Sequence, residues 1–112
     1  MKLVTAVIRP SKVDDVKEAL KSSGVLGMTV TEVQGFGRQL GHTEIYRGAE
    51  YKVDLIPKVT VEILADDESA QRIAEAVTAA ARTDSVGDGK IWLTEVAGVM
   101  RIRTGERDDD AI

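Results

Sequence analysis

A short glycine-rich segment carries the residue types that can bind a phosphate group. Gly87-Asp88-Gly89-Lys90 places two glycines around an aspartate, directly before an apolar run. Glycine lets the backbone approach a ligand closely, and consecutive main-chain N–H groups can form an anion-binding nest. Lys90 adds positive charge. Taken alone, such a segment is more often a plain turn, and it lacks the P-loop spacing of glycine, four residues and Gly-Lys-Ser/Thr.

A pair of arginines offers a second group of anion ligands. Arg101 and Arg103 stand two apart in a segment that we expect to be extended, so their side chains would point to the same side. Guanidinium groups match the geometry of phosphate oxygens. A solvated pair is nevertheless the commoner arrangement, so the pair alone does not decide between a binding site and a surface.

A long polar connection, residues 37–55, separates two runs that are typical of strands. It carries both tyrosines within Tyr46-Arg47-Gly48-Ala49-Glu50-Tyr51, and the only histidine, His42. Long connections inside compact domains are uncommon and are usually functional or disordered. We therefore expect a loop that other molecules contact. His42 has no second histidine and no cysteine beside it, which leaves a catalytic zinc or a nucleophilic triad almost without support. The glycines from Gly35 to Gly41 precede a loop and not a helix, so they do not predict a Rossmann site.

Composition indicates one soluble domain over residues 1–112. The chain is 43% hydrophobic and 30% charged, and it contains no cysteine. The lack of cysteine excludes disulfides and thiolate metal sites and suits a reducing cytoplasm, where we expect the protein. No segment approaches the length of a membrane span. A net charge of −4 gives no general attraction to nucleic acid or anionic lipid.

Local patterns place four strands and two helices along the chain. We expect strands at residues 2–9, 28–36, 59–63 and 91–99, with Trp92 in the core. The alternation slips between Val30 and Val33, which is the pattern of a bulge. Ser11 is the expected N-cap of the first helix, and Gly24 closes it in the left-handed conformation. Asp66 or Asp67 caps the second helix. The three aspartates at 108–110 predict a frayed, solvated end.

The order strand-helix-strand, repeated once, predicts the architecture. It is the α+β, ferredoxin-like double βαβ pattern: an antiparallel sheet with both helices on one face and a long loop between the second and third strands. The other face of the sheet is left without cover. Because exposed apolar area of that size usually marks an interface, we expect a homo-oligomer. Thr29, Thr31 and Thr60 would lie near water at that interface.

Two motifs, in order, give the chain a family resemblance. The hexapeptide Tyr46 to Tyr51 is similar to the modification-site signature of the PII signal-transduction proteins of nitrogen metabolism. The segment from Thr83 to Leu93 resembles the C-terminal signature of the same family. Further segments match as well: residues 28–33, 35–39, 57–58 and 101–106. The resemblance runs from end to end of the chain.

The resemblance implies a homotrimer with ATP or ADP in each cleft between neighbouring subunits. The implied ATP/ADP ligands are Thr29, Gly35, Gly37, Arg38, Gln39, Glu62, Leu64, Gly87, Asp88, Gly89, Lys90, Arg101 and Arg103. Gln39 would reach the Mg²⁺ carried by ATP, and that Mg²⁺ would chelate 2-oxoglutarate. The implied 2-oxoglutarate ligands are Gly37, Gln39, Leu40, Gly41 and Lys58. No catalytic residue is implied.

The resemblance also implies a modification and a set of partners. Residues 37–55 would be the regulatory loop, and residues 104–112 a C-terminal tail. Tyr51 would receive UMP or AMP from a nucleotidyltransferase; we expect it, and not Tyr46, because we place Tyr51 at the loop tip and Tyr46 nearer the anchored base. Other implied partners are an ammonium channel, which would be the only route to the membrane, and regulators of glutamine synthetase. Nucleic acid is not expected as a partner.

Two rival interpretations remain open, and one departure bears on affinity. A slow ATPase would use the same phosphate ligands and Mg²⁺, but we see no dedicated base to activate water. A structural ferredoxin-like oligomer of the metal-tolerance type would share the fold but leave both motifs unexplained. Asp84 and Ser85 replace the family's common Gly-Lys/Arg, which removes positive charge beside the expected phosphates.

Overall fold

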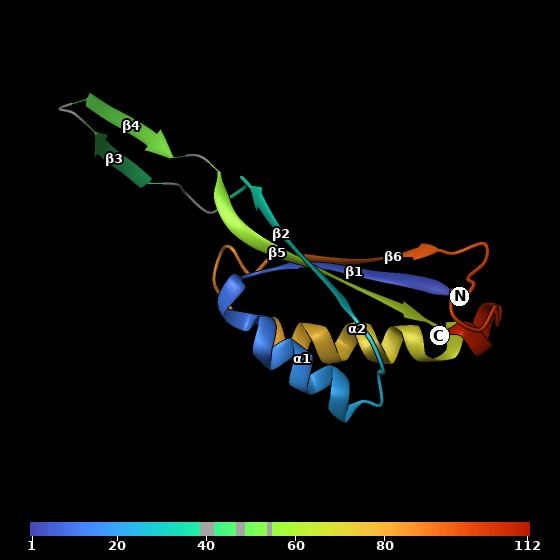
Figure 1. The fold of residues 1–112 in the computed structure, drawn as a ribbon. Coiled ribbons are helices and arrows are strands. Elements are labelled where there is room, and N and C mark those ends of the chain that lie inside the picture. The colour runs from blue at the N-terminus through green and yellow to red at the C-terminus, as the bar shows by residue number, and fades with distance from the viewer. Residues whose placement is uncertain (39–41, 47–48, 54) are drawn as a thin grey trace.

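The computed structural model describes residues 1–38, 42–46, 49–53 and 55–112, and only the backbone of 42–46 and 49–53. Its elements in chain order are β1 (Lys2–Ile8), η1 (Pro10–Lys12), α1 (Val13–Ser22), β2 (Thr29–Gly35), β3 (His42–Tyr46), β4 (Ala49–Val53), β5 (Ile56–Ala65), α2 (Asp67–Ala81), β6 (Lys90–Glu95) and η2 (Asp108–Ala111). Four strands form an antiparallel sheet in the order β2-β5-β1-β6, and both helices cover one face of it (Figure 1). The α+β, ferredoxin-like prediction is confirmed.

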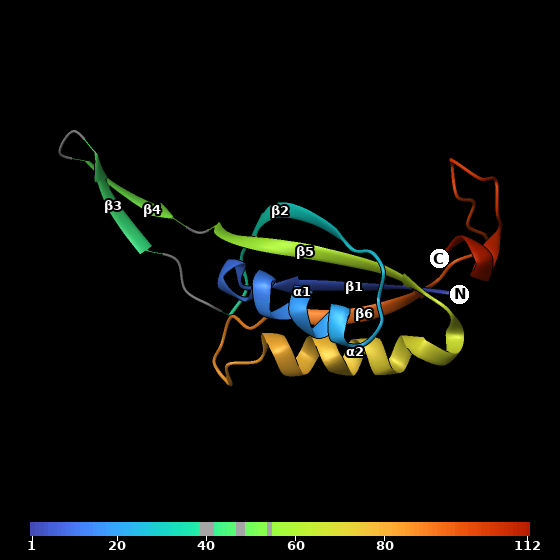
Figure 2. The ribbon, with the colours of Figure 1, turned by 60° about the horizontal axis from the view of Figure 1, so that its bottom comes forward.

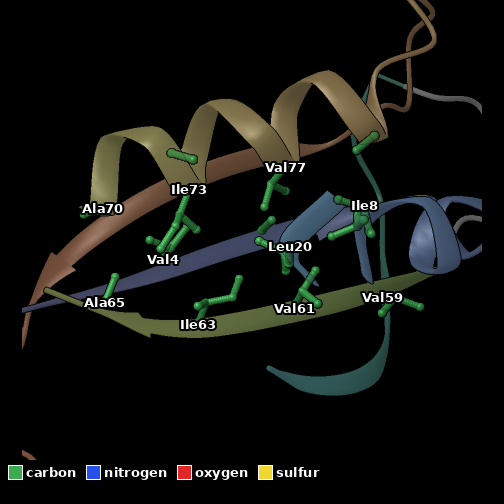
Figure 3. Packing of buried hydrophobic residues seen from close by; sticks show 14 residues of the cluster. Val4, Ile8, Leu20, Val59, Val61, Ile63, Ala65, Ala70, Ile73 and Val77 are labelled. Carbon is green, nitrogen blue, oxygen red and sulfur yellow. The ribbon is translucent and has the colours of Figure 1, made fainter. Parts of the chain in front are cut away.

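The core lies between the helices and one face of the sheet. Strict alternation along β1 turns Val4, Ala6 and Ile8 toward the helices, and these residues pair with Ile63, Val61 and Val59 of β5. Leu20 of α1 and Val77 of α2 pack onto these side chains (Figure 3). All are nearly or fully buried, and fully burying one aliphatic side chain contributes about 1.5–3 kcal/mol. This layer fixes the sheet that carries the loops at its two ends.

The residues that the structure describes leave the opposite face of the sheet uncovered. It presents Leu3 and Val7 of β1, Thr60 and Leu64 of β5, and Trp92 of β6, because these positions alternate with the buried ones. Trp92 is 45% exposed, so the expectation that it belongs to the core is wrong for the single chain. The alternation of the strand residues predicts which of them share a face but not whether that face is covered.

The connection between β2 and β5 contains a separate two-stranded arm. β3 and β4 pair with each other and with no other strand (Figure 1). Both views show this arm extending beyond the end of the four-stranded sheet (Figure 2). The sequence indicated only a long polar connection at residues 37–55, so neither β3 nor β4 was predicted. Tyr51 lies in β4 opposite Glu44, whereas Tyr46 ends β3 opposite Ala49, the first residue of β4. Our placement of Tyr51 at the tip and Tyr46 nearer the base is therefore wrong.

The two helices begin in different ways. Asp66 accepts a hydrogen bond from the Ser69 amide at 2.8 Å and caps α2, as predicted, which also lowers the pKa of Asp66. Ser11 does not cap α1: it lies inside η1, and α1 begins at Val13 without a side-chain cap. Pro10 at the start of η1 favours this tight turn because its φ is already helical. Gly24 follows α1 with a φ of +82°, as predicted.

Strand limits and the C-terminal segment also depart from expectation. β2 pairs with β5 in one unbroken register from Thr29 to Gly35, so the predicted bulge is absent. β6 ends at Glu95 and not at residue 99. The three aspartates do not fray: they form η2, and the Asp108 amide donates to the Val99 carbonyl at 2.9 Å. No helix in the part of the chain that the structure describes is long and apolar enough to cross a membrane.

Candidate functional site

The loop between α2 and β6 is organised around the carboxylate of Asp88. Oδ2 accepts hydrogen bonds from the amides of Thr83 at 2.8 Å and Asp84 at 2.9 Å. Oδ1 accepts a short bond from the Thr83 hydroxyl and one from Nε of Arg9 at 3.0 Å. The Thr83 hydroxyl and amide, followed by Arg9 and the Asp84 amide, hold the pKa of Asp88 far below its usual range. Both carboxylate oxygens are thus turned into the loop.

Two cations from other strands fasten the same loop to the sheet. Arg9, which follows β1, donates through Nη2 to the Val86 carbonyl at 2.8 Å. Lys58 of β5 donates through Nζ to the Gly87 carbonyl at 2.6 Å. Burial lowers the pKa of Lys58, and the positive charge of Arg9 lowers it further, while Asp88 opposes both. The loop therefore takes its shape from residues of two neighbouring strands.

Gly89 marks the closest approach of this loop to the sheet. Its φ is +97°, and a Cβ built on it would lie 1.7 Å from the Val7 carbonyl oxygen. Gly87 also has a positive φ, +105°. Both values lie in the region that side chains disfavour, so glycine fits these two positions. Asp84 adopts a positive φ of 67° without being glycine.

The loop lines one wall of a hollow of about 540 Å³. The opposite wall comes from the end of β2 and the start of the arm connection, where Phe36 is 80% exposed. The hollow brings together many of the residues expected to bind nucleotide phosphates and 2-oxoglutarate: Gly35, Gly37, Arg38, Lys58, Gly87, Asp88, Gly89 and Lys90. The lining includes several glycines and the cationic residues Arg38, Lys58 and Lys90, a composition that suits an anion.

The remaining nucleotide candidates lie at the far end of the sheet. Thr29, Glu62 and Leu64 line a second hollow of about 650 Å³, together with the C-terminal residues Ala111 and Ile112. Lys58 and Leu64 are six positions apart on β5, and at about 3.3 Å per residue this separates them by roughly 20 Å. One chain therefore does not bring all the predicted nucleotide residues together.

The arginine pair lies in a turn near that far end. The Arg101 amide donates to the Glu106 carbonyl at 2.9 Å, and the Gly105 amide donates to the Arg101 carbonyl at 2.8 Å. Figures 1 and 2 place this segment where β5 and β6 finish. The expectation of an extended segment is wrong, so alternation gives no reason for the two side chains to share a side. Arg103 is exposed.

Comparison with known proteins identifies the family of this site. The family model described as Nitrogen regulatory protein P-II matches residues 1–106. The chain belongs to the P-II family. It is 56% identical over 112 residues, all of both chains, to the nitrogen regulatory protein P-II of Pasteurella multocida. It is equally similar, over the same full lengths, to P-II 1 of Escherichia coli K12 and to P-II of Klebsiella oxytoca.

Some site residues predicted from the P-II resemblance lie outside the described residues. These are Gln39, Leu40 and Gly41. Tyr51 is described only by its backbone, in β4. Among the described residues, no group of three or more His, Cys, Asp or Glu side chains could hold a metal ion.

Arg9 was missed by the sequence analysis, although it binds the P-II loop at two points. It had been treated only as the end of the first strand. One signal was present in the sequence: a charged residue directly after a β-branched run, fixed before Pro10, must stand at the end of a strand. Nothing local indicates that its partner, Asp88, lies 79 residues away.

Proposed function

We propose that this P-II protein senses ATP against ADP, and 2-oxoglutarate, and reports both to nitrogen-assimilation targets in the cytoplasm by direct contact. The observation that carries the proposal is the hollow where the Gly87–Lys90 loop, Lys58 and Arg38 converge. Such a site, built from main-chain N–H groups and cations, suits phosphates and carboxylates. The curated relatives are named as regulatory proteins.

The division of the nucleotide ligands supports a site between subunits. A nucleotide that uses both the Gly87–Lys90 loop and the Thr29–Glu62–Leu64 group would meet the first group on one copy and the second on its neighbour. Such contacts are head-to-tail, and head-to-tail interfaces form a closed ring when the rotation between copies closes. The uncovered sheet face, with Trp92 and Leu64 exposed, gives the copies an apolar surface to share. A homotrimer with three clefts satisfies both features.

The 2-oxoglutarate proposal rests on Lys58 and the residues that follow β2. Lys58 supplies one cation for a dicarboxylate, and Gly37 supplies a main-chain N–H group beside it. One lysine is a weak site for a dianion, so the second carboxylate needs the Mg²⁺ carried by ATP. Mg²⁺ is commonly held by substrate phosphates and few protein ligands, so ATP would supply much of its coordination shell. Gln39 would complete the metal shell, and the 37–55 loop would follow its occupancy.

Titration calorimetry on the purified protein tests the sensing proposal. We expect one ATP per subunit, and heat from 2-oxoglutarate only when ATP and Mg²⁺ are both present. Because coupling between two ligands is reciprocal, 2-oxoglutarate must also tighten ATP. A 2-oxoglutarate affinity that is the same with ADP, or without nucleotide, would contradict the mechanism.

The arm is the proposed contact surface for partners. β3 and β4 extend away from the sheet, which would bring the arm within reach of another protein (Figure 2). We propose that Tyr51 is the residue modified by a nucleotidyltransferase and that the arm meets an ammonium channel and regulators of glutamine synthetase. The modification adds bulk and negative charge to the arm and would change which partner binds.

Two phenylalanine variants test the modification site. Tyr51→Phe removes the acceptor oxygen, so it should abolish labelling by the cognate transferase and leave ATP binding unchanged. Tyr46→Phe is the matched control, because it removes a phenol from the other strand of the same arm. Mass spectrometry of both variants decides the matter. Labelling that survives in Tyr51→Phe and disappears in Tyr46→Phe would reverse the assignment.

A further inference from the structure

Arg9 and Asp88 form a linked pair behind the glycine-rich loop. Nε of Arg9 lies 3.0 Å from Oδ1 of Asp88, and Nη2 lies 2.8 Å from the Val86 carbonyl oxygen. The two side chains are only 22% and 23% exposed. One planar guanidinium therefore donates hydrogen bonds to two acceptors of the loop in a fixed geometry, which the ammonium group of a lysine cannot reproduce.

The Asp88 carboxylate has no capacity left for a ligand in this arrangement. Four donors reach its two oxygens: the Thr83 amide and hydroxyl, the Asp84 amide and Arg9. A carboxylate aimed at a triphosphate would also repel it. The local geometry thus assigns Asp88 to the loop itself, with its charge matched by Arg9.

The same bonds set the direction of the main-chain N–H groups. In a trans peptide the carbonyl and the amide hydrogen point in opposite directions. Arg9 draws the Val86 carbonyl toward itself, so the Gly87 amide faces away from Arg9. Lys58 holds the Gly87 carbonyl in the same way, and the next amide, that of Asp88, donates to the Ser85 carbonyl at 3.3 Å. The orientation of these peptides depends on side chains from β1, β5 and the loop.

We infer that Arg9 and Asp88 are positioning residues of the nucleotide site, which hold residues 86–89 so that the main-chain N–H group of Gly87 faces a phosphate. The inference rests on the proposed nucleotide site and adds two roles to it. Neither side chain acts by its own charge on the ligand: Asp88 shapes the loop, and Arg9 fixes Asp88 and the Val86 carbonyl.

An electrostatic role and a positioning role for Asp88 predict opposite changes in ATP affinity when Asp88 is replaced. Asp88→Asn removes a negative charge beside the expected phosphates, so an electrostatic role predicts tighter ATP binding. The asparagine amide is a donor where the loop needs an acceptor, and it would face the donors of Thr83 or Arg9. Positioning therefore predicts weaker binding. We expect the dissociation constant for MgATP to rise at least tenfold.

Calorimetry of the full chain with MgATP, at one salt concentration, measures whether the dissociation constant rises or falls. Arg9→Lys keeps the charge but cannot reach both loop acceptors, so we expect several-fold weaker binding. The double variant should bind less weakly than the sum of the two single effects predicts, because one of the two Arg9 contacts is made to Asp88 itself. Asp14→Asn is the matched control: it neutralises a 91% exposed aspartate paired with Lys17 on α1, and should leave the dissociation constant within twofold.

Amide chemical shifts in the nucleotide-free protein separate positioning from loss of the fold. The Gly87 and Gly89 amides should shift in Asp88→Asn and in Arg9→Lys, while the amide of Val61 in the core stays in place. If the unsubstituted protein does not bind ATP, the nucleotide site and this inference both fail. If it binds ATP and Asp88→Asn binds equally or more tightly, the inference alone is overturned. Should Asp88→Asn not fold, unchanged affinity and unchanged glycine shifts in Arg9→Lys overturn it.

Discussion

The two ends of the sheet hold their loops by different means. At one end, residues 83–89 are fastened by side chains from distant strands, namely Arg9 after β1 and Lys58 on β5. At the other end, residues 101–107 are held by their neighbours, through bonds such as Arg101 amide to Glu106 carbonyl and the Met100–Arg107 bridge. The first loop is a product of the folded sheet, whereas the second is a local turn. Substitutions should therefore spread their effects at the first end and confine them at the second.

The largest effect should come from Gly89→Ala. The new methyl group would overlap the Val7 carbonyl, and the positive φ adds strain, so we expect a loss of about 2–5 kcal/mol in the free energy of unfolding. Gly24→Ala is the matched control, because its φ is +82° but nothing lies within 4 Å of a built Cβ. It should cost only about 1–2 kcal/mol. Urea unfolding of both variants compares them; equal losses would show that crowding at Gly89 is unimportant.

Arg103→Ala should weaken ATP binding and leave the fold unchanged. Losing a charge-assisted phosphate contact should cost about 1.5–3 kcal/mol of ATP binding. Arg103 is exposed and its turn is held by other residues, so the free energy of unfolding should not change. Calorimetry and urea unfolding measure the two quantities. Arg107→Ala, at an exposed arginine of the same segment, is the control; if it loses as much ATP affinity as Arg103→Ala, the assignment is wrong.

At low pH, protonation of Asp88 should lower the stability of the fold by releasing the loop at residues 83–89. The folded loop lowers the pKa of this carboxyl group, so between the folded and the ordinary value of 3.8 the unfolded chain binds the proton more tightly. The stabilisation is complete above about pH 5 and is lost as the pH falls toward the folded pKa. Asp88→Asn should therefore flatten the decline of stability between pH 5 and pH 3, measured by urea unfolding. An unchanged decline would show that Asp88 is not held as described.

The smallest effect should come from Glu106→Gln in the local turn. The Arg101–Glu106 ion pair is 2.9 Å long but solvent-exposed, and such pairs contribute about 0–1 kcal/mol. Main-chain bonds keep the turn when the charge is removed, so stability should fall by less than about 1 kcal/mol. A larger loss in urea unfolding would mean that side chains, and not the backbone, hold this end.

Much of the architecture could be predicted because its signals are local. The alternation of Val4, Ala6 and Ile8, and the cap at Asp66, follow from neighbouring residues and survive in the fold. The first cap failed because Pro10 begins a tight turn that occupies Ser11. In the candidate site, the sequence indicated the glycine loop and the resemblance added Lys58; the structure places both in one hollow. The modified tyrosine and the trimer stay predictions.

The sequence by itself determined the order of the four sheet strands and the two helices, the alternation that puts Val59, Val61 and Ile63 on one face, and the membership of the P-II family. Only the tertiary structure decided what those residues meet. It placed Arg9 against Asp88, Gly89 under the Val7 carbonyl, and Trp92 on an uncovered face. Periodicity and capping act over a few residues and can be read along the chain, whereas a contact across 79 positions depends on how every strand between them pairs.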